Sequence, residues 1–161
     1  MSGLQRFRDA QNASYSGFQA ALEEIRTGGK SGHWIWYVFP QMSGLGSSGL
    51  SHTFAIDDEQ EAIDYLRDSE LRSRLLTITS AVADQLRHGK SLRALMGSDI
   101  DARKIVSSLT LFHHVASKLS ERESADVYGS LAAVAGEVLA VAASQGYPRC
   151  AFTITRLVAS P

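Results

Sequence analysis

The sequence predicts a mainly α-helical fold: a compact, single-domain, multi-helix protein with at most a minor extended or β element. Apolar residues recur at helical spacing in five or six segments, and capping residues and glycines mark the ends of most of them. By contrast, at most two short segments have the composition of a strand. A chain of 161 residues can bury roughly 70% of its unfolded surface in one domain, which we expect over residues 1–161.

The N-terminal part is predicted to be one amphipathic helix. Apolar residues alternate at steps of three and four from Leu4 to Ile25, and Gly28-Gly29 end the pattern. The next segment, His33 to Phe39, is bulky on both faces, which is typical of a buried extended piece or a short internal turn. Residues 43–51 are predicted to be a loop.

Capping signals predict the middle helices. Asp57 and Gln60 form a capping-box pattern for a short helix, and Ser69 is the expected cap of a longer helix. A short helix is expected from Ser91 to Gly97, and Ser98 or Asp99 opens the next one.

Two further elements are predicted at the C-terminal end. Ser120 and Glu123 form a second capping box ahead of an Ala/Val-rich helix that Gly146 ends. The tail from Phe152 to Val158 is β-branched, and a short strand and a last helical turn both remain open.

The charge balance disfavours broad nucleic-acid binding. Sixteen basic and seventeen acidic residues give a formal net charge of −1, so no basic stripe is expected for nucleic acid or an anionic membrane. Cys150 is the only cysteine, which excludes an intrachain disulfide and a cysteine-based zinc cluster. The polar N-terminus and the lack of a long apolar run lead us to expect a cytoplasmic protein with no membrane partner.

The segment from Lys30 to Gly49 is the best candidate for a site, because it combines both tryptophans with a histidine, a lysine and three glycines. Its Gly44-Leu-Gly46-Ser-Ser-Gly49 run matches G-x-G-x-x-G, but no strand and helix flank it as a dinucleotide fold requires. A backbone nest for phosphate and an ordinary connecting loop both remain open.

Five side chains of this segment are candidates, and each has a structural alternative. An acid, base or donor role for His33 competes with a structural hydrogen bond to a carbonyl. Trp34 and Trp36 either stack on a ligand ring or anchor the segment in the core. Lys30 either neutralises a phosphate or lies at a helix C-terminus, and Gln41 either contacts a ligand or satisfies the turn backbone.

A second candidate group lies between residues 99 and 114. On a helix, Asp101, Lys104 and Ser108 share one face, which suits the wall of a polar pocket. The alternative is a surface ion pair between Asp101 and Lys104. The adjacent His113 and His114 point about 100° apart, so they cannot chelate one metal together, and no metal or cofactor is predicted.

The chain resembles the bacterial family catalogued as domain of unknown function 1810. The resemblance runs over roughly Leu4 to Phe112, and it is carried by two elements: Lys30 with His33-Trp-Ile-Trp-Tyr-Val-Phe-Pro-Gln41, and Ser107-Ser-Leu-Thr-Leu-Phe112. It implies a compact, mostly helical domain with no established reaction. Two departures from the family pattern stand out: Leu109 replaces a methionine, and the tail lacks an aspartate before Thr153.

The leading hypothesis is a soluble domain that binds, and in one version hydrolyses, a phosphorylated nucleotide or ADP-ribose-type ligand in a pocket between residues 30–49 and 101–112. A tryptophan would stack on the ring, Lys30 and the glycine amides would hold phosphate, and His33 or Asp101 would transfer a proton. The alternative is a non-enzymatic protein-interaction or self-association module that uses the Ala/Val-rich helix. Whether the protein is an enzyme stays open at this stage.

Overall fold

The computed structural model describes residues 2–124 and 126–159, and this part of the chain contains ten helices and no strand. The predicted mainly α-helical fold is therefore confirmed, with 72% of the residues in helices. Minor extended structure is limited to an isolated parallel bridge between Met42 and Ile56. The helices are α1 (Ser2–Gln11), α2 (Phe18–Arg26), α3 (Ile35–Val38), α4 (Gly49–Thr53), α5 (Glu59–Arg67), α6 (Ser69–Arg87), α7 (Leu92–Met96), α8 (Asp99–Glu123), α9 (Asp126–Ser144) and α10 (Ala151–Ala159).

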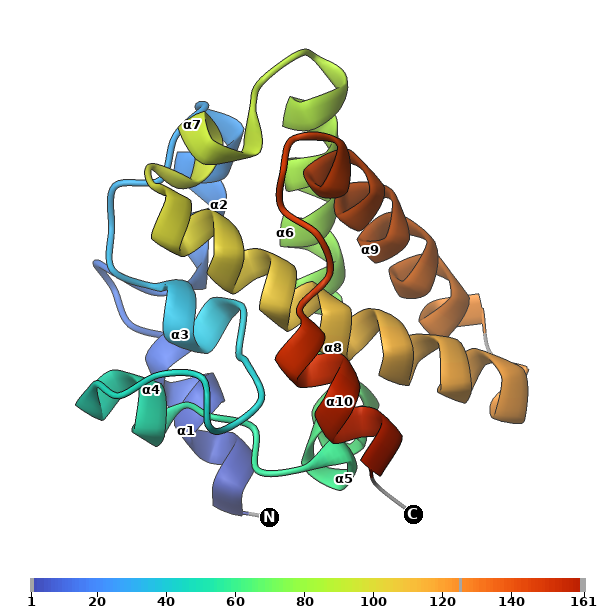
Figure 1. Cartoon of the computed structure of the whole chain (residues 1–161). Coiled ribbons are helices and arrows are strands. Elements are labelled where there is room, and N and C mark those ends of the chain that lie inside the picture. The colour runs from blue at the N-terminus through green and yellow to red at the C-terminus, as the bar shows by residue number, and fades with distance from the viewer. Residues whose placement is uncertain (1, 125, 160–161) are drawn as a thin grey trace.

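Helix α8 is the centre of the fold. It has 25 residues and runs diagonally through the molecule, with α5, α7, α9 and α10 packed against it (Figure 1). Helix α6 packs against both α9 and α2, and the short helix α3 lies between α1 and α8. Most residues of the apolar stripes predicted from the sequence face this one core, whereas Tyr15 in the loop before α2 and Val127 at the start of α9 are exposed.

The predicted single helix from Leu4 to Ile25 is wrong, because the chain breaks between α1 and α2. A Cβ atom at Gly17 would lie 2.2 Å from the Ala13 carbonyl oxygen, so the connecting loop turns back too tightly for any other residue. The side chain of Gln11, at the end of α1, donates to the Tyr37 carbonyl at 2.8 Å. The apolar spacing continues across the break because both helices face the same core.

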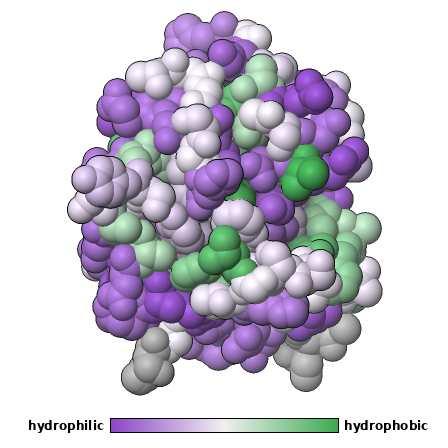
Figure 2. Space-filling model, turned by 90° about the vertical axis from the view of Figure 1, so that its left-hand side faces the viewer, coloured by the Kyte–Doolittle hydropathy of each residue, from purple (hydrophilic) through white to green (hydrophobic). Residues whose placement is uncertain are grey.

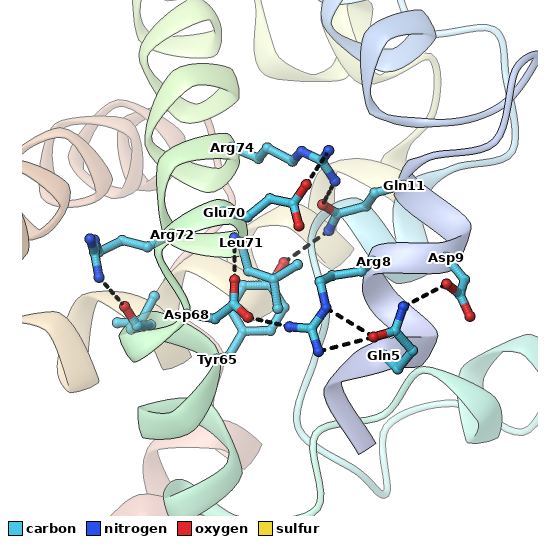
Figure 3. A network of polar contacts seen from close by, with 11 residues as sticks. Gln5, Arg8, Asp9, Gln11, Tyr65, Asp68, Glu70, Leu71, Arg72 and Arg74 are labelled. Atoms are coloured by element: carbon cyan, nitrogen blue, oxygen red, sulfur yellow. Dashed lines mark hydrogen bonds and ion pairs between the residues drawn. The ribbon is translucent and has the colours of Figure 1, made fainter. Parts of the chain in front are cut away.

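Polar contacts fix α1 against the corner between α5 and α6 (Figure 3). Arg8 forms an ion pair with Asp68, whose carboxylate also accepts the Leu71 N–H and so caps α6. Arg74 donates to Gln11 at 3.2 Å, which joins α6 to α1 a second time. This side of the fold is therefore held by charge-assisted hydrogen bonds as well as by apolar packing.

The capping predictions differ in accuracy. Ser91 and Ser98 cap α7 and α8 as predicted. The caps predicted at Asp57 and Ser69 are each off by one residue, since Asp58 and Asp68 accept the hydrogen bonds. The second capping box, Ser120 with Glu123, is wrong because α8 continues through Glu123.

Helices α9 and α10 complete the fold. By length and composition alone, α9 is apolar enough to cross a membrane, which for a single helix is weak evidence; 33% of this stretch is buried, and the buried residues pack against α6 and α8. The tail forms a helix, so the alternative of a short strand is wrong, and Leu157 of α10 is buried.

Candidate functional site at the contact between α3 and α8

Lys30 forms a buried ion pair with the first turn of α8. Its Nζ lies 2.7 Å from Asp101 Oδ2 and donates to the Gly32 carbonyl at 2.7 Å. The Lys30 side chain is only 6% exposed, and its backbone N–H donates to Leu95 of α7. The structure thus brings Lys30 and Asp101 together, but each already neutralises the other.

Glu24 organises the segment that follows Lys30. Its Oε1 accepts the N–H groups of Ser31 and Gly32 at 2.8 Å and the indole N–H of Trp34 at 2.9 Å. Burial alone would raise the pKa of Glu24, but these hydrogen bonds and the Lys30 ammonium hold that pKa below its usual value. Glu24 could not be predicted from the sequence, because no motif relates a helical carboxylate to a tryptophan ten residues later.

Trp34 is an anchor of the core. Its side chain is 0% exposed, its ring packs against Phe39, and the Lys30 ammonium lies 5.1 Å from the ring centroid. The only polar atom of its side chain, Nε1, donates to Glu24. Of the two roles that the sequence left open for Trp34, the structure thus shows the anchor in the core.

Trp36 differs from Trp34 although it lies only two residues away. It is partly buried, and the Nζ of Lys104 lies 4.6 Å from the centroid of its ring. Its Nε1 is buried and has no hydrogen-bond partner in the described part of the chain. Lys104 also lies 3.8 Å from Asp101 Oδ1, so two ammonium groups share one carboxylate.

Ser108 lies one helical turn beyond Lys104, on the same face of α8. Its side chain is completely buried, and its Oγ has no hydrogen-bond partner among the described residues. By contrast, Thr110 on the next face donates to the Val106 carbonyl at 2.7 Å. A buried polar group without a partner costs roughly 1–3 kcal/mol. Helices α3 and α8, which pack together, therefore each carry one such group: Trp36 Nε1 and Ser108 Oγ.

The glycine run lies apart from Lys30. Gln41, Gly44 and Gly46 line a separate hollow of about 190 Å3 near α4, whereas Lys30 lies beside α7 (Figure 1). A Cβ atom at Gly44 would lie 2.9 Å from the ring of Phe152, and one at Gly46 would lie 2.2 Å from Ser51 Oγ. Close packing is sufficient to explain why both positions are glycine, without a phosphate-binding nest.

His33 lies exposed on the chain just before α3, while its neighbour Trp34 is enclosed. The carbonyl of His33 lies 3.5 Å from the Tyr37 hydroxyl, which helps to fix the backbone at this position. Of the ten candidate residues, contacts join Lys30, Trp34, Trp36, Asp101 and Lys104 near the start of α8, and Ser108 lies one turn beyond Lys104.

Comparison with known proteins places the chain in a family. The model of the family described as "Protein of unknown function (DUF1810)" matches residues 1–129. The chain belongs to this family. The predicted resemblance is thereby confirmed, and the family match covers the start of α9 in addition to the residues that suggested it.

A solved structure shows the same fold. The chain is 32% identical to the conserved hypothetical protein Rv1873 from Mycobacterium tuberculosis, with a TM-score of 0.75. The similarity covers 98% of this chain and 97% of the other. No curated protein matches the chain. The relatives establish family and fold, and the chemistry of the site has to be argued from its residues.

Proposed function

We propose that the protein binds a small anionic ligand with an aromatic ring, of nucleotide or ADP-ribose type, at Trp36, Lys104 and Ser108. One observation carries the proposal: on two helices that pack together, the buried Trp36 N–H of α3 and the buried Ser108 hydroxyl of α8 both lack a partner among the described residues. Buried polar groups are normally hydrogen-bonded, and unpaired ones in a native protein are often explained by function. A ligand with donor and acceptor groups would satisfy both.

The charges near this contact favour an anion. Asp101 carries one negative charge, while Lys30 and Lys104 carry two positive charges. Lys30 is enclosed and interacts with both Asp101 and Glu24, so the positive charge of the partly exposed Lys104, 3.8 Å from Asp101, is the less closely paired of the two. A phosphate on the ligand would balance that charge.

The position of Lys104 indicates how the ligand would enter. In the free protein its ammonium lies over the ring of Trp36, where a cation is attracted to the aromatic face. An incoming base would stack on this ring, as bases do on exposed aromatic side chains. The long Lys104 side chain would then turn from the ring to the phosphate.

The proposal covers binding and not hydrolysis. Lys30 and Trp34 support the site instead of touching the ligand, because both are enclosed and fully paired. Asp101 is held by Lys30, and His33 lies exposed ahead of α3, so the roles predicted for them in proton transfer stay predictions.

Thermal unfolding with a panel of ligands tests the proposal. AMP, ADP, NAD and ADP-ribose would be added to the purified protein, with ribose 5-phosphate as a control that lacks the base. A ligand at a hundredfold excess over its dissociation constant stabilises the folded state by about 2.7 kcal/mol, which raises the Tm by roughly 5–10 °C for a domain of this size. No shift with any member of the panel would contradict the proposal.

Two lysines of α8 provide matched variants. Lys104→Met removes the cation over Trp36, while Lys118→Met removes a lysine of similar exposure that pairs with Glu59 further along the helix. We expect Lys104→Met to weaken binding at least tenfold and Lys118→Met to leave it unchanged. An equal loss in both variants would show that general charge, and not this site, attracts the ligand.

The alternative from the sequence, a protein-interaction or self-association module, stays a prediction. On the face drawn in Figure 2, hydrophilic residues predominate and the apolar ones are scattered or form small groups. Docking surfaces usually contain a larger continuous apolar patch. Helix α9, which this alternative would use, lies on the opposite side of the molecule (Figure 1), so our preference for the small-molecule site rests on the unpaired polar groups of Trp36 and Ser108.

A further inference from the structure

A second hollow, of about 310 Å3, lies between α8 and α10 and is separate from the proposed nucleotide site. Three apolar residues of α10 form one wall: Ile154, Leu157 and Val158. His113 and Lys118 of α8, together with Arg149 from the loop before α10, contribute polar atoms. The hollow therefore has an apolar wall opposite a polar side that carries basic groups and one carboxylate, Glu121.

Arg149 and His113 lie in direct contact at the edge of this hollow. The Nη1 of Arg149 lies 3.2 Å from Nδ1 of His113. Since a guanidinium is always a donor, Nδ1 must accept this hydrogen bond, and the imidazole is neutral. Burial lowers the pKa of His113, and the charges of Arg149 and His114 lower it further.

Arg149 is the cation that lacks a counter-charge here. Lys118 forms an ion pair with Glu59, and the Nε2 of His114 lies 3.5 Å from the same carboxylate. In the described part of the chain, by contrast, no carboxylate pairs with Arg149, and its partner is the neutral His113. The guanidinium of Arg149 therefore has N–H groups available to donate hydrogen bonds to an anion at this edge.

We propose that this hollow binds a small carboxylate with a short hydrocarbon tail. The carboxylate pairs with Arg149, and the tail lies along Ile154, Leu157 and Val158. The volume is at the small end of the range for ligand pockets, so it suits a short tail. Arginine and carboxylate match each other's geometry, which favours this anion over a hydrated halide ion.

Binding is coupled to a proton. When Arg149 turns to the carboxylate, Nδ1 of His113 loses its donor and comes close to a negative charge, so the imidazole takes up a proton. His114, Lys118 and Glu121 are the other titratable groups at the hollow, while α10 contributes none and α9 faces His113 with Gly136. The ligand therefore binds more tightly at pH 6 than at pH 8.

Hexanoate is the probe that tests this proposal, with neutral hexanamide as its control. Titration into the 15N-labelled protein should shift the backbone signals of Arg149 and Ile154 in a saturable way. Affinity should rise about threefold to fourfold with each methylene from butanoate to hexanoate. Equal binding of hexanamide, or no saturable shift with hexanoate, would overturn the proposal.

Variants separate this site from the rest of the surface. Arg149→Met should weaken hexanoate binding at least tenfold, whereas Arg26→Met, at a hollow between α2 and α6, should not change it. Ile154→Ser keeps the charge and should remove the dependence on chain length. Lys104→Met should leave hexanoate binding intact, so the two sites can fail independently.

The role of His113 has its own test. In the wild type, hexanoate should bind about threefold more tightly at pH 6 than at pH 8, and the pKa of His113 should rise in its presence. His113→Gln should abolish this difference, and His114→Gln should keep it. Unchanged binding in Arg149→Met, or a pH dependence that survives in His113→Gln, would refute the assignment.

Discussion

Trp34 and Trp36 lie two residues apart, each beneath a lysine ammonium, and yet their environments are opposite. Trp34 is enclosed, and its N–H donates to Glu24. Trp36 is partly exposed, and its buried N–H has no partner among the described residues. Around Trp34 each donor meets an acceptor, as a structural anchor requires. The Trp36 N–H has no such partner among the described residues, and this difference is the basis of the proposed binding site.

The largest expected effect is on stability. Trp34→Ala should lower the free energy of unfolding by about 3–5 kcal/mol, because it leaves a large cavity and removes a donor from Glu24. Trp36→Ala should lower it by only about 1–2 kcal/mol, since much less packing is lost. Urea denaturation measures both, and equal losses would remove the distinction between the two residues.

The two lysines sharpen the same comparison. Lys30→Met removes the main ion-pair partner of the partly buried Asp101, so it should lower the free energy of unfolding by about 3 kcal/mol. Lys104→Met removes a longer and more exposed contact of 3.8 Å and should cost less than about 1 kcal/mol. Replacing Asp101 by Asn together with Lys30→Met should recover part of the larger loss. If the double variant is no better than Lys30→Met alone, the ion pair is not what holds this segment.

Glu24 makes the environment of Trp34 sensitive to acid. Because folding lowers the pKa of this carboxylate, its contribution to stability is complete above its ordinary pKa of about 4.5 and is lost as the pH falls through the lowered value. Glu24→Gln should therefore be less stable than the wild type at pH 7 but lose less stability between pH 5 and pH 3. Parallel stability curves for the two proteins would contradict this role.

The smallest effect is expected at Ser108. Because its Oγ has no partner in the described part of the chain, Ser108→Ala removes an unpaired buried hydroxyl, so it should not lower the stability and should raise it by up to about 1 kcal/mol. Thr110→Val on the same helix should cost about 1 kcal/mol, since its Oγ1 donates to Val106 and accepts the Cys150 N–H. A large loss in Ser108→Ala would mean that the hydroxyl already has a structural partner.

Some of this fold follows from the sequence and some does not. The apolar spacing of α8 and the caps at Ser91 and Ser98 are local signals, so they predict their elements correctly. The break at Gly17 is not predictable from apolar spacing, because α1 and α2 face the same core and the pattern continues.

For the candidate site, too, the sequence predicts the local features and not the contacts between helices. Helical spacing correctly placed Lys104 and Ser108 on one face of α8. It did not show which tryptophan is enclosed, because that depends on how one short turn meets α1 and α8. On a helix, residues two apart point about 200° away from each other. The partner of Trp34, Glu24, comes from a separate helix, and no fixed spacing relates the two residues.

Tryptophan fluorescence tests the central claim most directly, because the chain contains only these two tryptophans. In Trp34→Phe the remaining emission comes from Trp36, and ADP-ribose should quench it in a saturable way through stacking on the ring. In Trp36→Phe the enclosed Trp34 should show no quenching. Saturable quenching of Trp34 with none of Trp36 would contradict the division between anchor and binding site.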